Sequence, residues 1–141
     1  MGDNRDRMLR AIAAFNAGDV DGYLASYADD ARVHGLPAAY PPTKDGLRAF
    51  LIDVRAGVPD LCVTVADTVA EGDRVAARLT YTGTHRGGLF GAAPTGRQLE
   101  WDGITIRRFD ASGRTVERWI RNDTVSLLAQ LGVAASRRPP G

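Results

Sequence analysis

The residues best suited to chemistry lie near the end of the chain, in the stretch ERWIRND at 117–123. On an extended strand, alternation places Trp119, Arg121 and Asp123 on one face. A carboxylate beside a large aromatic ring can lie in an apolar pocket, where lost hydration raises its pKa toward the range of a useful general base. We therefore expect Asp123 to remove a proton beside a carbonyl and to return one to the new alkoxide.

A second interpretation of Asp123 is structural. The order Asp-Thr-Val-Ser favours a helix start, where the carboxylate would accept backbone N–H groups of Val125 or Ser126. Such bonds lower the pKa of a carboxyl and weaken it as a base. Arg121 on the same strand face favours the ionised carboxylate, and it is the candidate cation for stabilising an enolate. Both interpretations stay open.

The chain has two histidines, His34 and His85. An imidazole near a carboxylate could move a proton at neutral pH. We expect His34 to face the pocket from a short strand, with a structural or surface hydrogen bond as the alternative. His85 ends a strand before Arg86-Gly87-Gly88 and is expected at the pocket rim. Neither has a second ligand at useful spacing, so no metal site is predicted.

Several large side chains are candidate walls for a flat ligand, since aromatic rings stack on flat ligands. Ordinary core packing is the alternative for each, and Tyr27 is expected in the core. The glycine-rich stretch at 87–91 lacks the Lys-Ser/Thr of a phosphate-binding loop, so Leu89 and Phe90 are expected in a lid or an oligomer contact. The predicted wall residues are Trp119, Trp101, Tyr23, Phe50 and Leu51, with His85 at the rim.

The spacing of apolar residues predicts an α+β fold. Helices are expected at 4–17, from Asp19 to the Asp29-Asp30 pair, and from Thr43 to Gly57, with a brief strand at 31–35 between the last two. From 59 onward the period becomes two, and four strands follow, turning at 71–73, at 87–96 and at 110–113. A closing helix is expected at 124–131. A curved, mostly antiparallel sheet wrapped over the N-terminal helices would leave a cone-shaped hollow.

The composition limits the classes of partner. The 141 residues predict one domain over 1–135 and a flexible tail at 136–141. The net charge of +1 and the scattered arginines favour no nucleic-acid partner. One cysteine, Cys62, excludes an internal disulfide, and it is expected to be a small buried hydrophobe. With no apolar stretch long enough to cross a bilayer, no membrane association and a cytoplasmic location are expected.

Short motifs along the chain resemble those of the SnoaL-like polyketide cyclases. Each is weak alone, but eight in the same order, over about residues 5–133, make a specific pattern. They are FNAGD at 15–19, YADD at 27–30, PDL at 59–61, EGDRV at 71–75, TGTH at 82–85, PTGR at 94–97, ExWxxxD at 117–123 and QLG at 130–132.

This resemblance implies the cone-shaped α+β barrel of the nuclear-transport-factor-2-like proteins, with an internal pocket. It implies chemistry without metal or organic cofactor, and assembly as a homodimer or homotetramer. It also implies an aldol-type ring closure of a polyketide substrate, with Asp123 as the acid/base. One position departs from the pattern: Thr105 stands where the cyclases have a histidine on the neighbouring strand. A hydroxyl can bind a carbonyl but cannot relay protons near pH 7.

The sequence thus favours a cofactor-independent enzyme of bacterial secondary metabolism that acts on an aromatic, polyketide-like carbonyl compound. Asp123 is the expected acid/base, His34 and Thr105 polarise or relay, and Arg121 stabilises charge. A non-catalytic binding module of the same fold is one alternative. The others are a hydroxylase-type variant and an epoxide hydrolase that uses Arg121 and Asp123 to position water.

Overall fold

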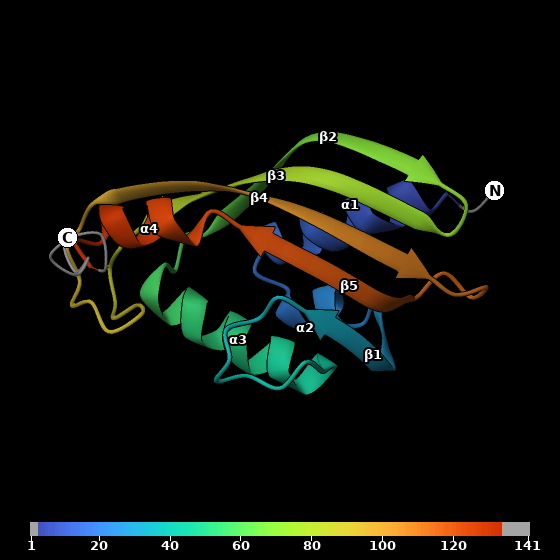
Figure 1. The fold of residues 1–141 in the computed structure, drawn as a ribbon, viewed down its shortest axis with the longest axis horizontal. Coiled ribbons are helices and arrows are strands. Elements are labelled where there is room, and N and C mark those ends of the chain that lie inside the picture. Colours follow the sequence, from blue (N-terminus) through green and yellow to red (C-terminus); the bar gives the residue numbers. More distant parts are fainter. Residues whose placement is uncertain (1–2, 134–141) are drawn as a thin grey trace, which may run out of the picture.

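Four helices and five strands lie within residues 3–133, the part of the chain that this computed structural model describes (Figure 1). The predicted element order is confirmed. The expected tail at 136–141, and the end of the predicted domain at 135, lie outside the described residues. The elements are α1 (Asn4–Asn16), α2 (Val20–Leu24), β1 (Tyr27–His34), α3 (Lys44–Gly57), β2 (Cys62–Glu71), β3 (Arg74–Thr84), β4 (Gln98–Phe109), β5 (Thr115–Asn122) and α4 (Thr124–Gln130).

Polar side chains fix where the helices begin. Asp19 accepts the backbone N–H of Gly22 at 2.8 Å, and Thr43 accepts that of Gly46 at 3.1 Å. Each bond satisfies a donor that the first helical turn leaves without a partner. The predicted helix starts at Asp19 and Thr43 are therefore confirmed.

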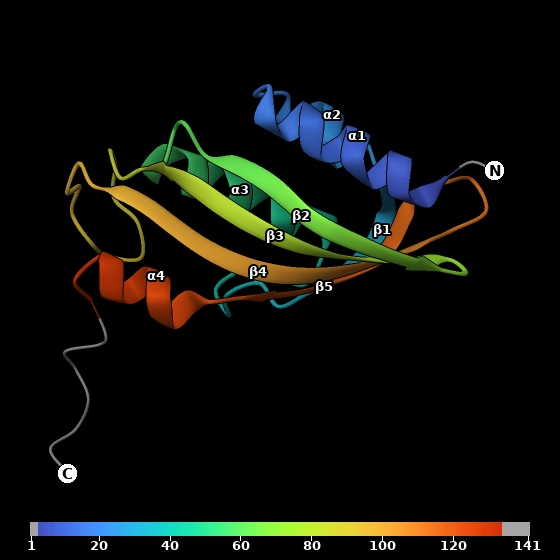
Figure 2. The same cartoon turned by 90° about the horizontal axis from the view of Figure 1, so that it is seen from above.

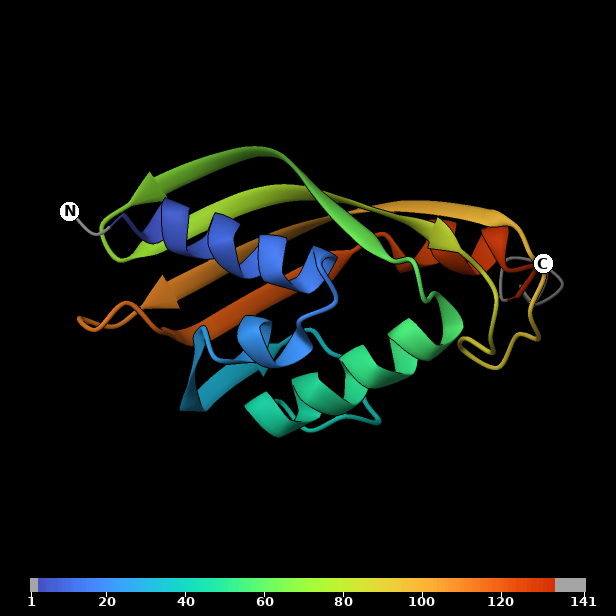
Figure 3. The ribbon, with the colours of Figure 1, turned by 180° about the vertical axis from the view of Figure 1, so that it is seen from behind.

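One curved sheet carries the five strands in the order β1-β5-β4-β3-β2. Only β1 and β5 run parallel; the other neighbouring pairs are antiparallel. Helices α1, α2 and α3 lie on one face of this sheet, as Figures 2 and 3 show. We call that face the inner face and the opposite one the outer face. The predicted α+β architecture, with a mostly antiparallel sheet over N-terminal helices, is confirmed.

Tight turns join two of the three antiparallel strand pairs, β2–β3 and β4–β5, where the sequence predicts them. Gly72, between β2 and β3, has φ of 59°, and Gly113, between β4 and β5, has φ of 87°. Only glycine adopts such backbone angles without a steric cost. The first turn sets the register of β2 with β3, and the second sets that of β4 with β5.

Helix α4 lies beside the part of β4 that β5 leaves unpaired (Figure 2). The side chain of Gln130 bonds both backbone groups of Glu100: it accepts the N–H at 3.0 Å and donates to the carbonyl at 2.7 Å. An amide side chain thereby replaces a missing strand partner. This contact keeps α4 at the end of the inner hollow.

The structure corrects three expectations. The second helix ends at Leu24 instead of at the Asp29-Asp30 pair, and β1 already begins at Tyr27. Tyr27 pairs with Thr115 of β5, and this long-range pairing overrides the helical spacing of the apolar residues. Cys62 is exposed, not buried.

None of the helices in residues 3–133 is long and apolar enough to cross a membrane.

Candidate functional site

A cavity of about 360 Å³ lies between the inner face of the sheet and the helices. Its walls are mainly apolar, and they come from the four helices and the inner positions of β2 to β5. Five residues predicted for the site line it, and four of these were predicted as walls. They are Tyr23, Phe50, Leu51, Trp101 and Thr105.

Two aromatic rings form one wall of the cavity. Tyr81 and Trp101 are paired across β3 and β4, and their rings stack with centroids 5.3 Å apart and planes 13° apart. Leu89 and Phe90, from the loop between β3 and β4, also line the cavity. That this loop acts as a lid stays a prediction.

The polar part of the cavity is built around Arg118, which is 6% exposed. Its Nε donates to Thr105 Oγ1 at 2.7 Å, and its Nη1 donates to the phenol oxygens of Tyr23 at 2.8 Å and Tyr27 at 3.0 Å. The two phenol oxygens lie 3.0 Å apart. We call Arg118, Thr105, Tyr23 and Tyr27 the arginine–tyrosine cluster. It joins α2, β1, β4 and β5, segments that are distant in the sequence.

A second guanidinium, that of Arg107, lies behind the cluster and is 1% exposed. Its Nη1 donates to Ser26 Oγ at 3.2 Å and to Thr115 Oγ1 at 3.1 Å. Its Cζ lies 4.6 Å from the ring centre of Tyr27 and 5.3 Å from that of Tyr23. Such cation–π contacts hold the charge against the two rings.

These surroundings shift the pKa values of the Tyr23 and Tyr27 phenols in opposite directions. Burial raises the pKa of Tyr23, but the positive charges of Arg118 and Arg107 outweigh it, so this pKa lies below its usual value. Burial also raises the pKa of Tyr27, and there the two arginines offset only part of the effect. Burial lowers the pKa of Arg118, but the phenol oxygens raise it by more, so the guanidinium stays charged. Of the two phenols, Tyr23 is therefore the one that holds its proton less tightly.

Asn122 adds an amide to the same cavity. It pairs with Gly103 across β4 and β5, and its side chain lies over that glycine, where a Cβ atom would come 2.0 Å from its Oδ1. This Oδ1 is buried and has no hydrogen-bond partner among residues 3–133. A buried polar atom without a partner costs free energy, so this oxygen is an exception among the buried polar groups.

Asp123 does not line the cavity. It is exposed and caps α4, where its Oδ1 accepts the backbone N–H of Ser126 at 3.0 Å. The expectation that strand alternation turns this carboxylate into an apolar pocket is wrong, because the strand ends at Asn122 and Asp123 already belongs to the helix start. The structural interpretation of Asp123 is the one that the geometry shows.

Trp119 and Arg121 face away from the cavity. Inner positions of β5 are taken by Arg118, Ile120 and Asn122, so alternation sends their neighbours to the outer face. Trp119 lies under the guanidinium of Arg74, 5.4 Å from its Cζ, and Arg121 donates to its neighbour's backbone carbonyl. The expectation that Trp119 forms a pocket wall and that Arg121 faces a substrate there is wrong. Both faces of β5 carry apolar and charged residues, so the pattern alone does not set its phase.

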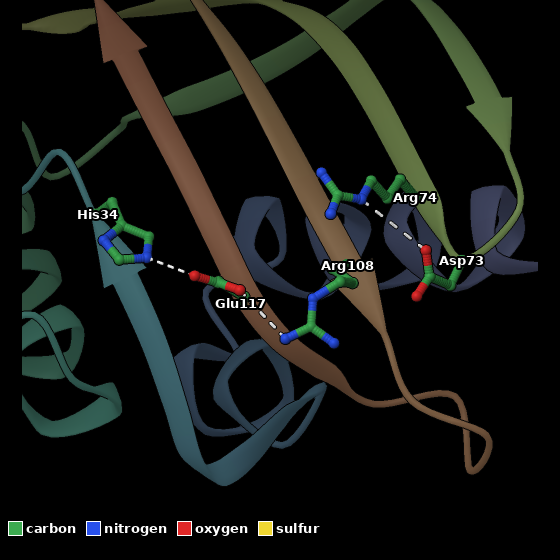
Figure 4. Close-up of polar contacts among 5 residues, drawn as sticks. All are labelled: His34, Asp73, Arg74, Arg108 and Glu117. Atoms are coloured by element: carbon green, nitrogen blue, oxygen red, sulfur yellow. Dashed lines mark hydrogen bonds and ion pairs between the residues drawn. The ribbon is translucent and has the colours of Figure 1, made fainter.

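His34 also lies on the outer face, where its Nε2 is 2.7 Å from Glu117 Oε2 (Figure 4). Arg108 Nη2 binds the other oxygen of that carboxylate at 3.1 Å. The hydrogen bonds from His34 and Arg108 lower the pKa of Glu117. The His34 ring stacks on Trp119, with ring centres 5.5 Å apart. His34 does not line the cavity, so the alternative, a structural hydrogen bond, is the one observed.

His85 is fully buried at the base of the loop between β3 and β4. Its Nδ1 lies 2.9 Å from Thr95 Oγ1, and it does not line the cavity. The expected rim position is therefore wrong, since the side chain packs inside the loop. No group of three potential metal-ligating side chains occurs in the described part of the chain.

Sequence reasoning missed Arg107, Arg118, Tyr27 and Asn122 as parts of the site. One signal was present: Arg107 and Arg108 are adjacent on a strand, so one of them must point inward. The same holds for the pair Arg118 and Trp119. Charged residues are expected on solvent faces, and this general tendency concealed the two that point in.

Comparisons with known proteins agree with this architecture. Residues 6–131 match the family model described as SnoaL-like polyketide cyclase. IdmH of Streptomyces antibioticus, a proposed polyketide cyclase, is 36% identical over 93% of this chain and 99% of its own, with a TM-score of 0.80. AclR of Streptomyces galilaeus, a proposed hydroxylase, is 31% identical over 94% and 97%, with a TM-score of 0.81.

TsrD of Streptomyces laurentii is 27% identical over 93% of this chain and 96% of its own, with a TM-score of 0.80. No curated protein matches the chain. The family match covers nearly all of the described residues, including every strand of the sheet and every wall of the cavity. The chain belongs to the SnoaL-like polyketide cyclase family.

Proposed function

We propose that this chain is a cofactor-independent enzyme that performs acid/base chemistry on a polyketide-like carbonyl compound inside the cavity. The observation that carries this proposal is the arginine–tyrosine cluster at the wall of an otherwise apolar hollow. A charged donor aimed into such a space stabilises an oxygen on which negative charge develops. The family membership supports the substrate class.

In this proposal Tyr23 accepts the proton beside the carbonyl, and Arg118 stabilises the resulting enolate oxygen. When the enolate carbon attacks a second carbonyl of the same molecule, a C–C bond forms and the new alkoxide takes the proton back from Tyr23. Thr105 holds the guanidinium in place through its 2.7 Å bond to Nε. Asp123 is the competing acid/base, because its neighbours Asn122 and Thr124 both line the cavity.

Proton exchange tests the proposal without knowledge of the natural substrate. Proton NMR in deuterium oxide would follow the loss of the acidic protons of 2-tetralone, a small bicyclic ketone. We expect exchange above the buffer rate, and a loss of about 100-fold in Tyr23→Phe. The rate should rise with pH and level off below pH ~10, because the phenolate is the base and the pKa of Tyr23 is lowered.

Arg118→Gln should also lower the exchange rate by about 100-fold, and Arg118→Lys by less, since it keeps the charge. Thermal unfolding of each variant would confirm that it is folded. Exchange at the buffer rate in the wild type would overturn the acid/base proposal and favour a binding module. A loss in Asp123→Asn with full activity in Tyr23→Phe would move the role to Asp123.

Hydroxylation is the second candidate function, and the 31% identity to the proposed hydroxylase AclR favours it. The two reactions differ in their mass balance. The aldol ring closure leaves the mass of the substrate unchanged, and a following dehydration removes one H₂O. Hydroxylation is a two-electron oxidation that adds one oxygen atom, and it requires O₂ together with an electron donor. Mass spectrometry of the product formed from a polyketide extract would separate them.

We also propose that two copies of the chain meet through the outer face, in keeping with the expected homodimer or homotetramer. Ile104 on that face of β4 is 56% exposed. Arg78 of β3 and Arg121 of β5 flank it, and Arg78 pairs with Asp67. Farther along the same face, Arg108 pairs with Glu117. A face with an exposed apolar centre and balanced charges is suited to contact a second copy of itself.

A further inference from the structure

Two positive charges are buried side by side at the cavity without a carboxylate to balance them. Arg118 is 6% exposed and Arg107 is 1% exposed. The ion pairs found within residues 3–133 all involve other side chains. A charge removed from water is costly unless an opposite charge accompanies it. An arrangement of this kind therefore indicates that an anion completes the site.

The groups that surround the two guanidinium groups are neutral acceptors. Arg118 donates to the oxygens of Thr105, Tyr23 and Tyr27, while Arg107 donates to two hydroxyl oxygens and lies over the tyrosine rings. The Nη2 atom of Arg107 has no hydrogen-bond partner within the described residues. Hydroxyls and rings orient these cations but leave their net charge in place.

The shape of the cavity restricts what kind of anion it admits. Tyr81 and Trp101 form a flat wall from two stacked rings, and most other lining residues are aliphatic or aromatic. A volume of about 360 Å³ lies at the small end of the range found for ligand pockets. An inorganic anion would make no contact with most of the apolar walls, whereas a flat aromatic molecule would pack against them.

We infer that the cavity binds its ligand as an aromatic oxyanion: a flat ring system whose ionised carboxylate, phenolate or enolate oxygen lies at Arg118 beside Tyr23. Arg107 adds its charge from behind the two tyrosines. The inference rests on the proposed function only in taking the same cavity as the ligand site, and it requires no turnover. An enolate beside neutral Tyr23 carries the same charge as a neutral ketone beside ionised Tyr23, so one anionic site serves both states.

Matched ligands test this inference. Isothermal titration calorimetry at pH 7 and low salt would compare 2-naphthoate with 2-naphthamide, which has the same rings and no charge. We expect the anion to bind about tenfold more tightly or better, the preference that one buried opposite charge produces. Equal affinity of the two ligands, or binding of neither, would overturn the inference.

A second probe separates a carboxylate from a phenolate or enolate source. The absorption of 2-naphthol changes when it ionises, so a pH titration with and without protein reports the pKa of the bound molecule. If the site accepts a phenolate or enolate, that pKa falls on binding. A site built for carboxylates alone would bind naphthoate and leave the naphthol pKa unchanged. Both results support an oxyanion site, and each identifies whether the site binds a carboxylate or a phenolate-type oxygen.

Arginine variants locate the preference. Arg118→Gln and Arg107→Gln should each reduce the ratio of naphthoate to naphthamide affinity by several-fold, and Arg118→Lys should keep most of it. Arg78→Gln removes the same charge from the outer face, where the side chain is 60% exposed, and should leave the ratio unchanged. A ratio unaltered in both Arg107→Gln and Arg118→Gln would overturn the assignment. If Arg118→Gln does not fold, the two ligands and Arg107→Gln still decide.

The outcomes separate this inference from the proposed function. Anion preference without proton exchange from 2-tetralone would keep the oxyanion site and remove the acid/base role. Exchange that depends on Tyr23, with no preference for naphthoate, would do the reverse.

Discussion

Two kinds of acidic group could move a proton in this protein, and their surroundings set their roles. Asp123 is exposed at the start of α4, where its carboxylate accepts the backbone N–H of Ser126. Tyr23 is buried between Arg118 and Arg107, whose charges lower its pKa. Desolvation and nearby charge, which shift the pKa of a buried group, both act on Tyr23.

A pair of substitutions at Asp123 separates helix capping from catalysis. Asparagine caps helices about as well as aspartate, so Asp123→Asn should change the free energy of unfolding by less than ~0.5 kcal/mol. Asp123→Ala removes the bond to Ser126 and should destabilise the fold by about 1 kcal/mol. Urea unfolding measures both. If Asp123→Ala lowers the free energy of unfolding no more than Asp123→Asn does, the hydrogen bond to Ser126 does not stabilise the start of α4.

At the scale of elements, the site depends on which residues of β4 and β5 point inward. The registers pair Gly103 with Asn122 and Thr105 with Ile120. Gly103 leaves space for the amide of Asn122, and Thr105 anchors Arg118 from the neighbouring strand. Two adjacent strands thus form one polar wall from small residues on β4 and long ones on β5.

Filling the space above Gly103 should disturb this wall more than it disturbs the fold. In Gly103→Ala the new Cβ would lie 2.0 Å from Asn122 Oδ1 and 3.2 Å from Tyr81 Cε2, so the amide must rotate away. We expect a loss of stability of about 1 kcal/mol and a several-fold loss of naphthoate affinity by calorimetry. Gly88→Ala is the control, since its Cβ would meet nothing closer than 3.9 Å. Equal affinity in both variants would count against a role for Asn122 in binding.

At the scale of the whole molecule, the sheet separates two surfaces of different character. Its inner face forms the cavity, and its outer face carries the His34–Glu117 contact (Figure 4). Trp119 and the exposed Ile104 lie on the same outer face. The candidate residues that sequence reasoning placed in the pocket but that lie on the outer face are available for assembly. Oligomerisation and catalysis would then use opposite sides of the same strands.

The proposed assembly predicts a mass of at least twice the 15.1 kDa of one chain in sedimentation equilibrium. Ile104→Asp should shift the protein toward the monomer, because a charge would be buried in the contact. Ile52→Asp is a matched control, since Ile52 lies on α3 and is 57% exposed, against 56% for Ile104. Dissociation in both variants, or in neither, would contradict a contact through the outer face.

Local signals in the sequence were sufficient for most of the fold. Capping residues such as Asp19 and Thr43, the glycines at the two hairpin turns and the change of period after residue 59 act over a few positions. Their physical causes are hydrogen bonds and backbone angles within a single turn, so they can be recognised without knowledge of the rest of the chain. The predicted boundary between α2 and β1 is wrong because pairing with a distant strand, β5, sets where β1 begins.

The sequence by itself determined the order of the elements, the family motifs and part of the apolar cavity wall. Only the tertiary structure decided the polar site. Arg118 and Tyr23 are 95 positions apart, and their contact exists only because β5 lies over α2. Alternation along β5 allows either Arg118 or Trp119 to face inward, and local hydrophobicity does not choose between them. Arg118 faces inward because its guanidinium binds the phenols of Tyr23 and Tyr27 and the hydroxyl of Thr105. These groups, and the space above Gly103, lie beside β5 only in the folded protein.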